Sequence, residues 1–305
     1  MKSWMRLLIA VVILIVVIAV LYWPQKPKTV AAAKPLVTLH QDQVNHIAIS
    51  QPGLPQVVLT KSASGWKLEQ PYAFAADGPT VDSLLNALGD ITGATDVGAS
   101  SNAAAFGLDK PSTVELGLSN GQTLDFEFGA NTPTGGNAYL RLGASGPVEM
   151  APSDVRDNAL KSAFDLQDKT VIQFADGQLT ALDLTSGAKK LHLDRINNAW
   201  PKDQQSDAQS LIDALQDGQM TALPDPTGQD AAKEGLAHPA ITVKLSWKGG
   251  SSELDLGAKQ GAAQYFARNS SSPAIFTLSD YLVTDINNLL TPPKPLTVAP
   301  AKTPK

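Results

Sequence analysis

Two pairs of carboxylates have the residue types and spacing that could carry catalysis. Asp125 and Glu127 form one pair, Glu253 and Asp255 the other, and each lies in a segment whose other residues are largely apolar. Alternate residues of a strand point to the same face, so each pair is expected to share one polar face. Such a pair could serve acid–base chemistry or bind Ca²⁺. We favour a solvated sheet face that discourages edge pairing, because no histidine, asparagine or third carboxylate lies nearby in the sequence.

The four histidines do not form a familiar metal or catalytic motif. His40 and His46 are six positions apart, which suits neither helical nor strand ligand spacing. His192 alternates with leucines, which predicts that it lies on the outer face of a strand. His238 lies in a phrase that the chain repeats, but the matching residue of the other copy is Lys110. A ligand or catalytic group is not expected to be exchanged in this way.

Other candidate motifs are also interpreted as structural. The glycine-rich segment Thr134–Ala138 lacks the Gly-Lys-Ser/Thr ending of a phosphate loop, which predicts a connection between strands. Trp66, Trp200 and Trp247 could form a platform for sugar stacking, but packing in a core is the favoured interpretation. The chain has no cysteine, a net charge of -5 and no basic stripe. We therefore predict no catalytic residue, cofactor, metal ligand or nucleic-acid partner.

The amino-terminal segment predicts a membrane anchor. Residues Leu7 to Trp23 form an unbroken apolar run of 17 residues, which Pro24 ends. At 1.5 Å per residue such a helix would span about 25 Å, near the lower limit for crossing a bilayer. Tyr22 and Trp23 stand where aromatic rings favour the membrane interface. We expect residues 1–24 to be a transmembrane helix whose apolar part ends at Leu7 and Trp23.

The flanking segments bear on topology. Ala31–Ala33 leaves a cleaved signal peptide open as an alternative, although its distance from Trp23 favours a retained anchor. Basic residues lie on both sides of the apolar run, so orientation is argued from the short tail ahead of a large domain, which favours export of that domain. Residues 25–35 are expected to be a linker and residues 291–305 a disordered tail rich in proline and lysine.

The segment between the linker and the tail contains a sequence pattern that occurs twice. "GLDKP" begins at Gly107 and "GLAHP" at Gly235, and each precedes an alternating apolar run that closes on glycine. Two sets of apolar residues at helical spacing recur 127 positions apart: Val81, Leu84, Leu85 and Leu88, then Ala208, Leu211, Ile212 and Leu215. Antiparallel runs with helices between them indicate an α+β fold. We predict two tandem, similar α+β repeats built of antiparallel meanders, over residues 36–164 and 165–290.

Local signals refine this prediction. Small polar residues stand at expected helix starts: Asp77, Ser206, Ser153-Asp154 and Ser279-Asp280. Gly107 and Gly235 are each expected to end a short helix in a left-handed conformation. Counting along the copies pairs Ala138–Leu142 with Gln264–Arg268, position by position.

Several of these phrases carry a family resemblance. They are Trp66, "AADGPTVDSLLNAL" (Ala75 to Leu88), "FGLDKP" (Phe106 to Pro111) and "FDLQDKTVIQF" (Phe164 to Phe174). In these, the chain resembles a bacterial envelope family known only as a domain of unknown function, number four-three-four-zero. The resemblance covers most of residues 36–290. One departure is Gln167, where the family usually has arginine.

The resemblance implies a cellular location and a class of partner, and it implies no reaction. Its members look like companions of ABC-type transport systems that resemble gliding-motility exporters, and no catalytic residues are assigned to them. It therefore implies a single-pass protein of the bacterial inner membrane, with its folded part in the periplasm, that binds ABC-type transporter components. Two alternatives stay open: a carbohydrate- or lipid-binding module of the envelope, and a glycan hydrolase using carboxylates from facing lobes.

Overall fold

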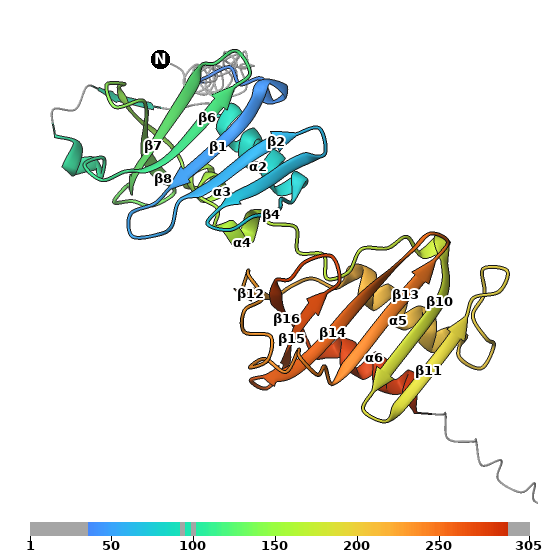
Figure 1. The fold of residues 1–305 in the computed structure, drawn as a ribbon. Coiled ribbons are helices and arrows are strands. Elements are labelled where there is room, and N and C mark those ends of the chain that lie inside the picture. Colours follow the sequence, from blue (N-terminus) through green and yellow to red (C-terminus); the bar gives the residue numbers. More distant parts are fainter. Residues whose placement is uncertain (1–35, 92–94, 99–101, 292–305) are drawn as a thin grey trace, which may run out of the picture.

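The computed structural model describes residues 36–91, 95–98 and 102–291, which form two lobes that follow one another along the chain (Figure 1). The predicted anchor between Leu7 and Trp23, the linker 25–35 and almost all of the tail lie outside the described residues. Within the part of the chain that is described, no helix combines the length and apolar composition needed to cross a bilayer. The described strands form one nine-stranded and one seven-stranded sheet, so the α+β prediction is confirmed.

The first lobe contains the nine-stranded sheet, in the order β4-β3-β2-β1-β6-β7-β8-β9-β5. Its strands are β1 (Val44–Ser50), β2 (Val57–Ser62), β3 (Gly65–Gln70), β4 (Phe74–Ala75), β5 (Thr95–Gly98), β6 (Ser112–Leu118), β7 (Thr123–Asn131), β8 (Asn137–Leu142) and β9 (Val148–Pro152). Its helices are α2 (Gly78–Gly89), α3 (Ser153–Ala159) and α4 (Ala163–Leu166), with 3₁₀ turns η1 (Gln41–Gln43) and η2 (Ala103–Phe106).

The second lobe contains the seven-stranded sheet, in the order β11-β10-β13-β14-β15-β16-β12. Its elements are η3 (Asp176–Gln178), β10 (Leu179–Ser186), β11 (Lys189–Asp194), α5 (Gln205–Asp217), β12 (Ala222–Asp225), β13 (Ile241–Trp247), β14 (Gly250–Gln260), β15 (Gln264–Asn269), β16 (Ile275–Ser279) and α6 (Tyr281–Leu290). This strand order repeats β2-β1-β6-β7-β8-β9-β5 of the first sheet one for one. In the described residues, only β3 and β4 have no counterpart in the second sheet.

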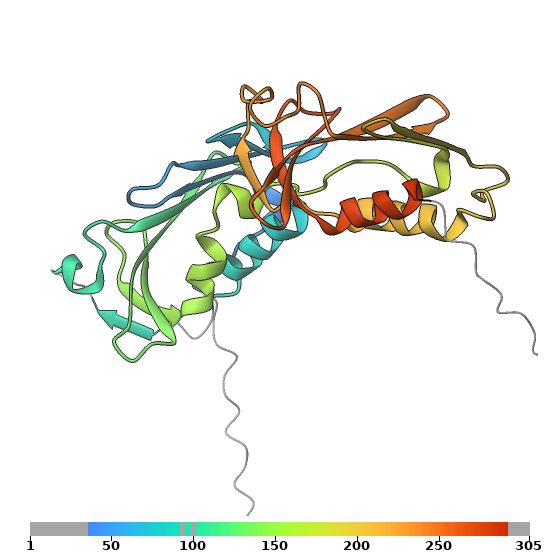
Figure 2. The same ribbon diagram turned by 90° about the horizontal axis from the view of Figure 1, so that it is seen from below.

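Each sheet buries one face under its helices, as Figure 2 shows from below. The apolar residues predicted for the faces of α2 and α5 are all buried, which confirms the helical spacing. Trp66 is part of the first core and Trp200 of the second. Two strands were not predicted: these are β5 and β12, and each pairs with the last strand of its lobe. They are four residues long, too short to show a clear alternation.

The helix starts are partly as predicted. Asp77 is the N-cap of α2, and its side chain accepts a hydrogen bond from the Thr80 N–H at 3.1 Å. Ser206 is not a cap, because a turn closed by the Gln204 N–H and the Pro201 carbonyl starts α5 earlier, at Gln205. The prediction of a Ser206 cap was therefore wrong by two residues.

The cap predicted for α3 was also wrong, whereas the one predicted for α6 is right in position, with Asp280 as the N-cap residue, but makes no capping bond. Pro152 is the N-cap residue of α3, and Asp154 instead accepts from the N–H of Val155, the next residue. Asp280 precedes α6 in a helical conformation, with no capping bond from its side chain. The proline side chain has no acceptor for a capping bond, and the helical backbone of Asp280 (φ -75°, ψ -8°) differs from the extended conformation that a capping residue adopts.

The repeated glycines are required by sterics. Gly107 ends η2 with φ 68°, as predicted, and Gly235 has φ 77° after a turn that is not a regular helix. A Cβ on Gly107 would lie 2.7 Å from the backbone nitrogen of Ala130. On Gly235 it would lie 2.8 Å from that of Ala258. Both the left-handed backbone and the close approach of a neighbouring strand therefore select glycine.

Candidate functional site

The two lobes meet at a short connector, Gln167–Thr170, which is bonded to both of them. Three backbone hydrogen bonds fix this region, each 2.8 Å long: Asp77 N–H to Leu166 O, Asp168 N–H to Ala75 O, and Met220 N–H to Lys169 O. Single bridges pair Ala76 with Gln167 and Thr170 with Gln219. The connector therefore acts as part of both folds and holds β4 of the first lobe close to Met220 of the second.

Gln167 is the buried polar centre of this junction. Its side chain is 0% exposed, and its Oε1 accepts a hydrogen bond of 2.8 Å from the Tyr72 hydroxyl. Its Nε2 lies 3.8 Å from Met220 Sδ, and a thioether is only a weak acceptor. Burial raises the pKa of Tyr72 to about 12, so the hydroxyl keeps its proton and stays a donor. The Tyr72–Gln167 bond thus ties the first lobe to the connector.

A pocket of about 260 Å³ opens at the same junction. Its apolar lining is formed by Ala73, Phe74, Ala75 and Met220, and its polar lining by Lys67, Asp168, Thr170, Gln173, Asn269, Ser271 and Ser272. Phe74 packs against the hydrophobic cores of both lobes. The pocket therefore exists only because the two lobes are held together.

A second pocket, of about 430 Å³, lies between α2 and α3. Five of its nine lining residues are polar, and all of them belong to the first lobe. It therefore lacks the contribution from both lobes that distinguishes the junction pocket.

The polar side of the junction pocket is held in place by local hydrogen bonds. Asp168 Oδ1 accepts from the Thr170 N–H at 2.9 Å and from the Thr170 hydroxyl at 2.6 Å. Its Oδ2 accepts a longer bond, of 3.4 Å, from Gln173 Nε2. These bonds occupy the carboxylate in an Asx-type turn, so Asp168 is positioned as a wall of the pocket and not as a free base.

Asn269 organises the opposite side in the same way. Its Oδ1 accepts from the Ser271 N–H at 3.1 Å, the Ser271 hydroxyl at 2.8 Å and the Ser272 N–H at 3.1 Å. Its Nδ2 donates to the Val171 carbonyl at 3.0 Å, and the side chain is buried. Asn269 therefore connects the loop that carries Ser271 and Ser272, called the serine loop below, to the segment that follows the connector.

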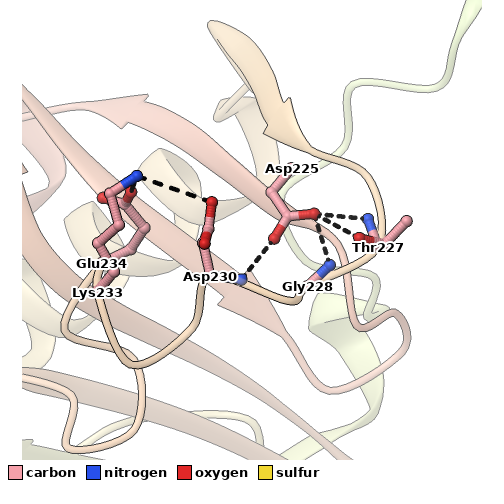
Figure 3. Close-up of polar contacts among 6 residues, drawn as sticks. All are labelled: Asp225, Thr227, Gly228, Asp230, Lys233 and Glu234. Atoms are coloured by element: carbon pink, nitrogen blue, oxygen red, sulfur yellow. Dashed lines mark hydrogen bonds and ion pairs between the residues drawn. The ribbon is translucent and has the colours of Figure 1, made fainter.

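A further loop is held together by the carboxylate of Asp225, as Figure 3 shows. Asp225 Oδ1 accepts from the Thr227 N–H and hydroxyl and from the Gly228 N–H, and Oδ2 accepts from the Asp230 N–H, at 2.7–2.9 Å. The Asp230 N–H is the largest of the causes that lower the pKa of Asp225 to about 2. A Cβ on Gly228 would lie 2.2 Å from the Pro273 carbonyl oxygen, so this loop packs directly against the end of the serine loop.

The first predicted acidic pair is divided between two roles. Glu127 Oε2 lies 2.6 Å from Arg141 Nη2 and 2.7 Å from its Nε, with both side chains largely buried. Arg141 Nη2 also donates to the Leu108 carbonyl at 3.4 Å. Asp125 is exposed. The prediction of a simply solvated face was therefore wrong for Glu127, which joins two strands to the loop that carries the repeated glycine.

The second pair repeats this arrangement. Arg268 Nη2 lies 3.2 Å from Asp255 Oδ2 and donates to the Leu236 carbonyl at 3.4 Å. Arg268 thus corresponds to Arg141, and the position-by-position pairing that matched Arg268 with Leu142 was wrong by one residue. The cause is that the two sequence phrases do not begin at equivalent strand positions: Arg141 lies opposite Glu127 and Arg268 opposite Asp255, and the register shift that follows lies at the equivalent place in both lobes.

The histidines are not brought together. His40 and His238 are exposed, His46 lies in β1 of the first sheet, and His192 lies in β11 of the second. His192 is exposed on its strand, as predicted, and its hydrogen bond to Asp183 at 2.6 Å is the main cause of its raised pKa. In residues 36–91, 95–98 and 102–291, no three histidine, aspartate or glutamate side chains are grouped to hold a metal ion.

The tryptophans and the glycine-rich segment are structural where the fold places them. Trp66 is 8% exposed and Trp200 is 3% exposed, so neither ring can stack on a sugar. Trp247 is partly buried against the second core. Thr134–Ala138 connects β7 to β8, as predicted.

One carboxylate is placed unfavourably in a strand. Glu149 in β9 is 8% exposed and lies opposite Asp96 of β5. Burial, and then the charge of Asp96, raise the pKa of Glu149. It lies in the first sheet and lines neither of the two pockets described above, so it bears on stability and is not a candidate catalytic group.

Sequence reasoning missed the junction residues. Tyr72 and Asn269 stand in different lobes, and nothing in the spacing connects them. The Asp225 loop did leave a signal, because Asp-Pro-Thr-Gly is typical of an Asx turn. Gln167 was noticed only as a departure from a resembled family, without a role.

Comparison with known proteins returned a single family. Residues 66–209 match the family described as "Domain of unknown function (DUF4340)", and residues 197–291 match it again. Neither the curated proteins nor the solved structures gave a match to the chain. Because the two matches together cover well over half of the sequence, the chain belongs to the DUF4340 family.

Proposed function

We propose that this chain is a membrane-anchored, extracytoplasmic accessory protein that binds a protein partner and has no catalytic activity of its own. The observation that carries the proposal is the junction pocket, which both lobes line and the connector holds in place. Its volume of about 260 Å³ is below the range of about 300–1,000 Å³ that is typical of small-molecule sites. A pocket of this size suits one side chain of a larger partner.

The setting that we propose is the bacterial inner membrane, with the lobes in the periplasm. It is supported by the apolar run from Leu7 to Trp23 and by the basic, proline-containing linker 25–35. The partner would be a component of an ABC-type envelope transport system, as the resemblance described above implies. Protease accessibility of the tail 291–305 in intact spheroplasts tests this topology: a protected tail would contradict it.

We also infer that the two lobes are tandem duplicates. Support comes from the shared strand order. It comes also from the ion pair found in each lobe, whose arginine donates to the carbonyl of the leucine that follows the repeated glycine. Duplication accounts for a large scaffold that carries few candidate functional groups.

The alternatives have weaker support. A hydrolase needs two carboxyl groups about 5–10 Å apart in one cleft. Glu127 and Asp255 are each paired with arginine and lie in different sheets. A sugar-binding module is disfavoured by the burial of Trp66 and Trp200, and a lipid-binding module by the small volume of the junction pocket.

Co-purification tests the proposal. The full chain, tagged at its C-terminus, is solubilised gently from native membranes and isolated. Recovery with ABC-type permease or ATPase subunits is expected, and the complex should persist through size-exclusion chromatography. Recovery of the chain alone under several mild detergents would contradict a stable accessory role.

A further inference from the structure

We propose that the junction pocket takes one apolar side chain, of the size of leucine, presented by an uncharged extended segment of the partner. This inference rests on the proposed function, because it names what that partner presents to the site. It follows from the floor of the pocket, its rim and its position between the sheets.

The floor is apolar and adaptable. Met220 is 4% exposed, and its thioether side chain lines the pocket together with the ring of Phe74. Methionine is unbranched and polarisable, so it can fit side chains of differing shape. An apolar group that enters here replaces water against a surface that both cores support.

The rim offers neutral hydrogen-bonding groups. The Ser271 hydroxyl donates to Asn269 Oδ1, so its oxygen remains free to accept a bond. The Ser272 hydroxyl accepts from the Ala274 N–H at 3.2 Å, so its own hydrogen remains available to donate. One acceptor and one donor side by side match the N–H and C=O of a peptide backbone.

The charges of the rim do not favour a charged ligand. Lys67 Nζ lies 3.3 Å from Glu69 Oε1, so this cation is paired. Both carboxylate oxygens of Asp168 accept hydrogen bonds, one from Thr170 and the other from Gln173. One cation and one anion leave the lining without net charge. Selection is therefore expected to come from the apolar side chain and not from its ionisation.

The location suits an extended chain. β4 is the terminal strand of the first sheet and β12 of the second, and the pocket is lined by Phe74 and Ala75 of β4 and by Met220, two residues before β12. A segment that runs between the ends of two sheets can place one side chain in the pocket and leave its backbone on the serine rim.

Methionine-methyl NMR tests the chemistry directly. The chain has four methionines, Met1, Met5, Met150 and Met220. In the full-length protein with ¹³C-methyl methionine in nanodiscs, N-acetyl-leucine N-methylamide should shift the Met220 signal saturably and leave Met150 unmoved. The glycine analogue should bind about 10-fold more weakly or worse, because it buries no side chain. Met1 and Met5 report on partitioning of the probe into the lipid.

A matched pair of variants locates the effect. Ser271→Trp fills the rim of the pocket, whereas Ser270→Trp changes the neighbouring exposed serine, which does not line it. Ser271→Trp should abolish the leucine-dependent shift and the co-purification of partner subunits, and Ser270→Trp should preserve both. Absence of a saturable Met220 shift, or its survival in Ser271→Trp, overturns the binding site. Loss of the shift with full retention of the partner overturns the pocket as the docking point.

These outcomes separate this inference from the proposed function. If wild-type protein brings down no transporter subunit, the accessory role fails, whatever the probe does. If subunits co-purify but the probe does not bind, the accessory role stands and the pocket assignment fails.

Discussion

Replacement of Tyr72 by phenylalanine isolates the hydrogen bond that ties the first lobe to the connector. The hydroxyl is removed, while the ring that packs against the first core remains. Gln167 Oε1 then loses its donor in a site where the residue is 0% exposed. The loss of stability comes mainly from the buried Gln167 oxygen that is left without a donor, and not from the net energy of the bond itself.

The expected magnitude follows from that burial. An unsatisfied buried acceptor costs about 1–3 kcal/mol. For a fold of this size each kcal/mol lowers the melting temperature by about 2–4 °C, so Tyr72→Phe should lower it by about 2–12 °C. Gln167→Leu should cost less, because the half-buried Tyr72 hydroxyl can turn toward water. The double variant replaces both partners by apolar groups and should be less destabilised than Tyr72→Phe alone.

Scanning calorimetry of the purified full-length protein measures all four proteins of this cycle. Tyr281→Phe is the matched control, since that tyrosine is 49% exposed and its hydroxyl is already solvated. The reasoning is refuted if Tyr72→Phe is no more destabilising than Tyr281→Phe. It is also refuted if the double variant loses the sum of the two single effects, because additivity would mean that the two side chains are not coupled.

Three further predictions concern pH and backbone sterics. The raised pKa of Glu149 means that its contribution to stability is complete below its unfolded pKa and is lost as pH rises through the folded pKa. Glu149→Gln should therefore raise the melting temperature at pH 7 but not at pH 3, and equal effects at both would contradict this. Asp225 has a pKa of about 2, so its contribution is present above the unfolded value and is lost as pH falls toward 2. The destabilisation caused by Asp225→Ala in thermal scans should shrink over that interval. Gly107→Ala should lower the urea midpoint more than Gly121→Ala: both glycines have positive φ, but only at Gly107 would the Cβ meet a backbone atom, at 2.7 Å from the Ala130 nitrogen.

Most of the helices and strands could be predicted from the periodicity of the apolar residues. Two kinds of pattern extend over enough residues to define the type of element: the four-residue apolar sets of α2 and α5, and the alternating apolar runs that follow the repeated glycines. The caps predicted at Ser206 and Ser153-Asp154 were misplaced because a one-residue signal cannot show where the preceding turn or strand ends.

The ion pairs show a different limit. Glu127 and Asp255 were noticed as carboxylates, but the partners that bury them come from the next strand. Counting along the copies misplaced Arg268 by one residue because the two phrases were matched from first residues that are not equivalent in the strands, although both strand pairs contain an irregularity at the same place. Register between strands depends on where such irregularities fall, and a single sequence does not mark them.

The position of the junction pocket follows from the place where the two lobes differ. The residues that the first lobe contributes to the pocket are Lys67 of β3, Phe74 and Ala75 of β4, and Ala73, which lies with Tyr72 between these strands. These are the strands for which the described second sheet has no counterpart. A repeated scaffold alone would produce two equivalent surfaces. The extra hairpin of the first lobe reaches the connector and Met220, so the chain forms this pocket once, at the point where the symmetry of its lobes is broken.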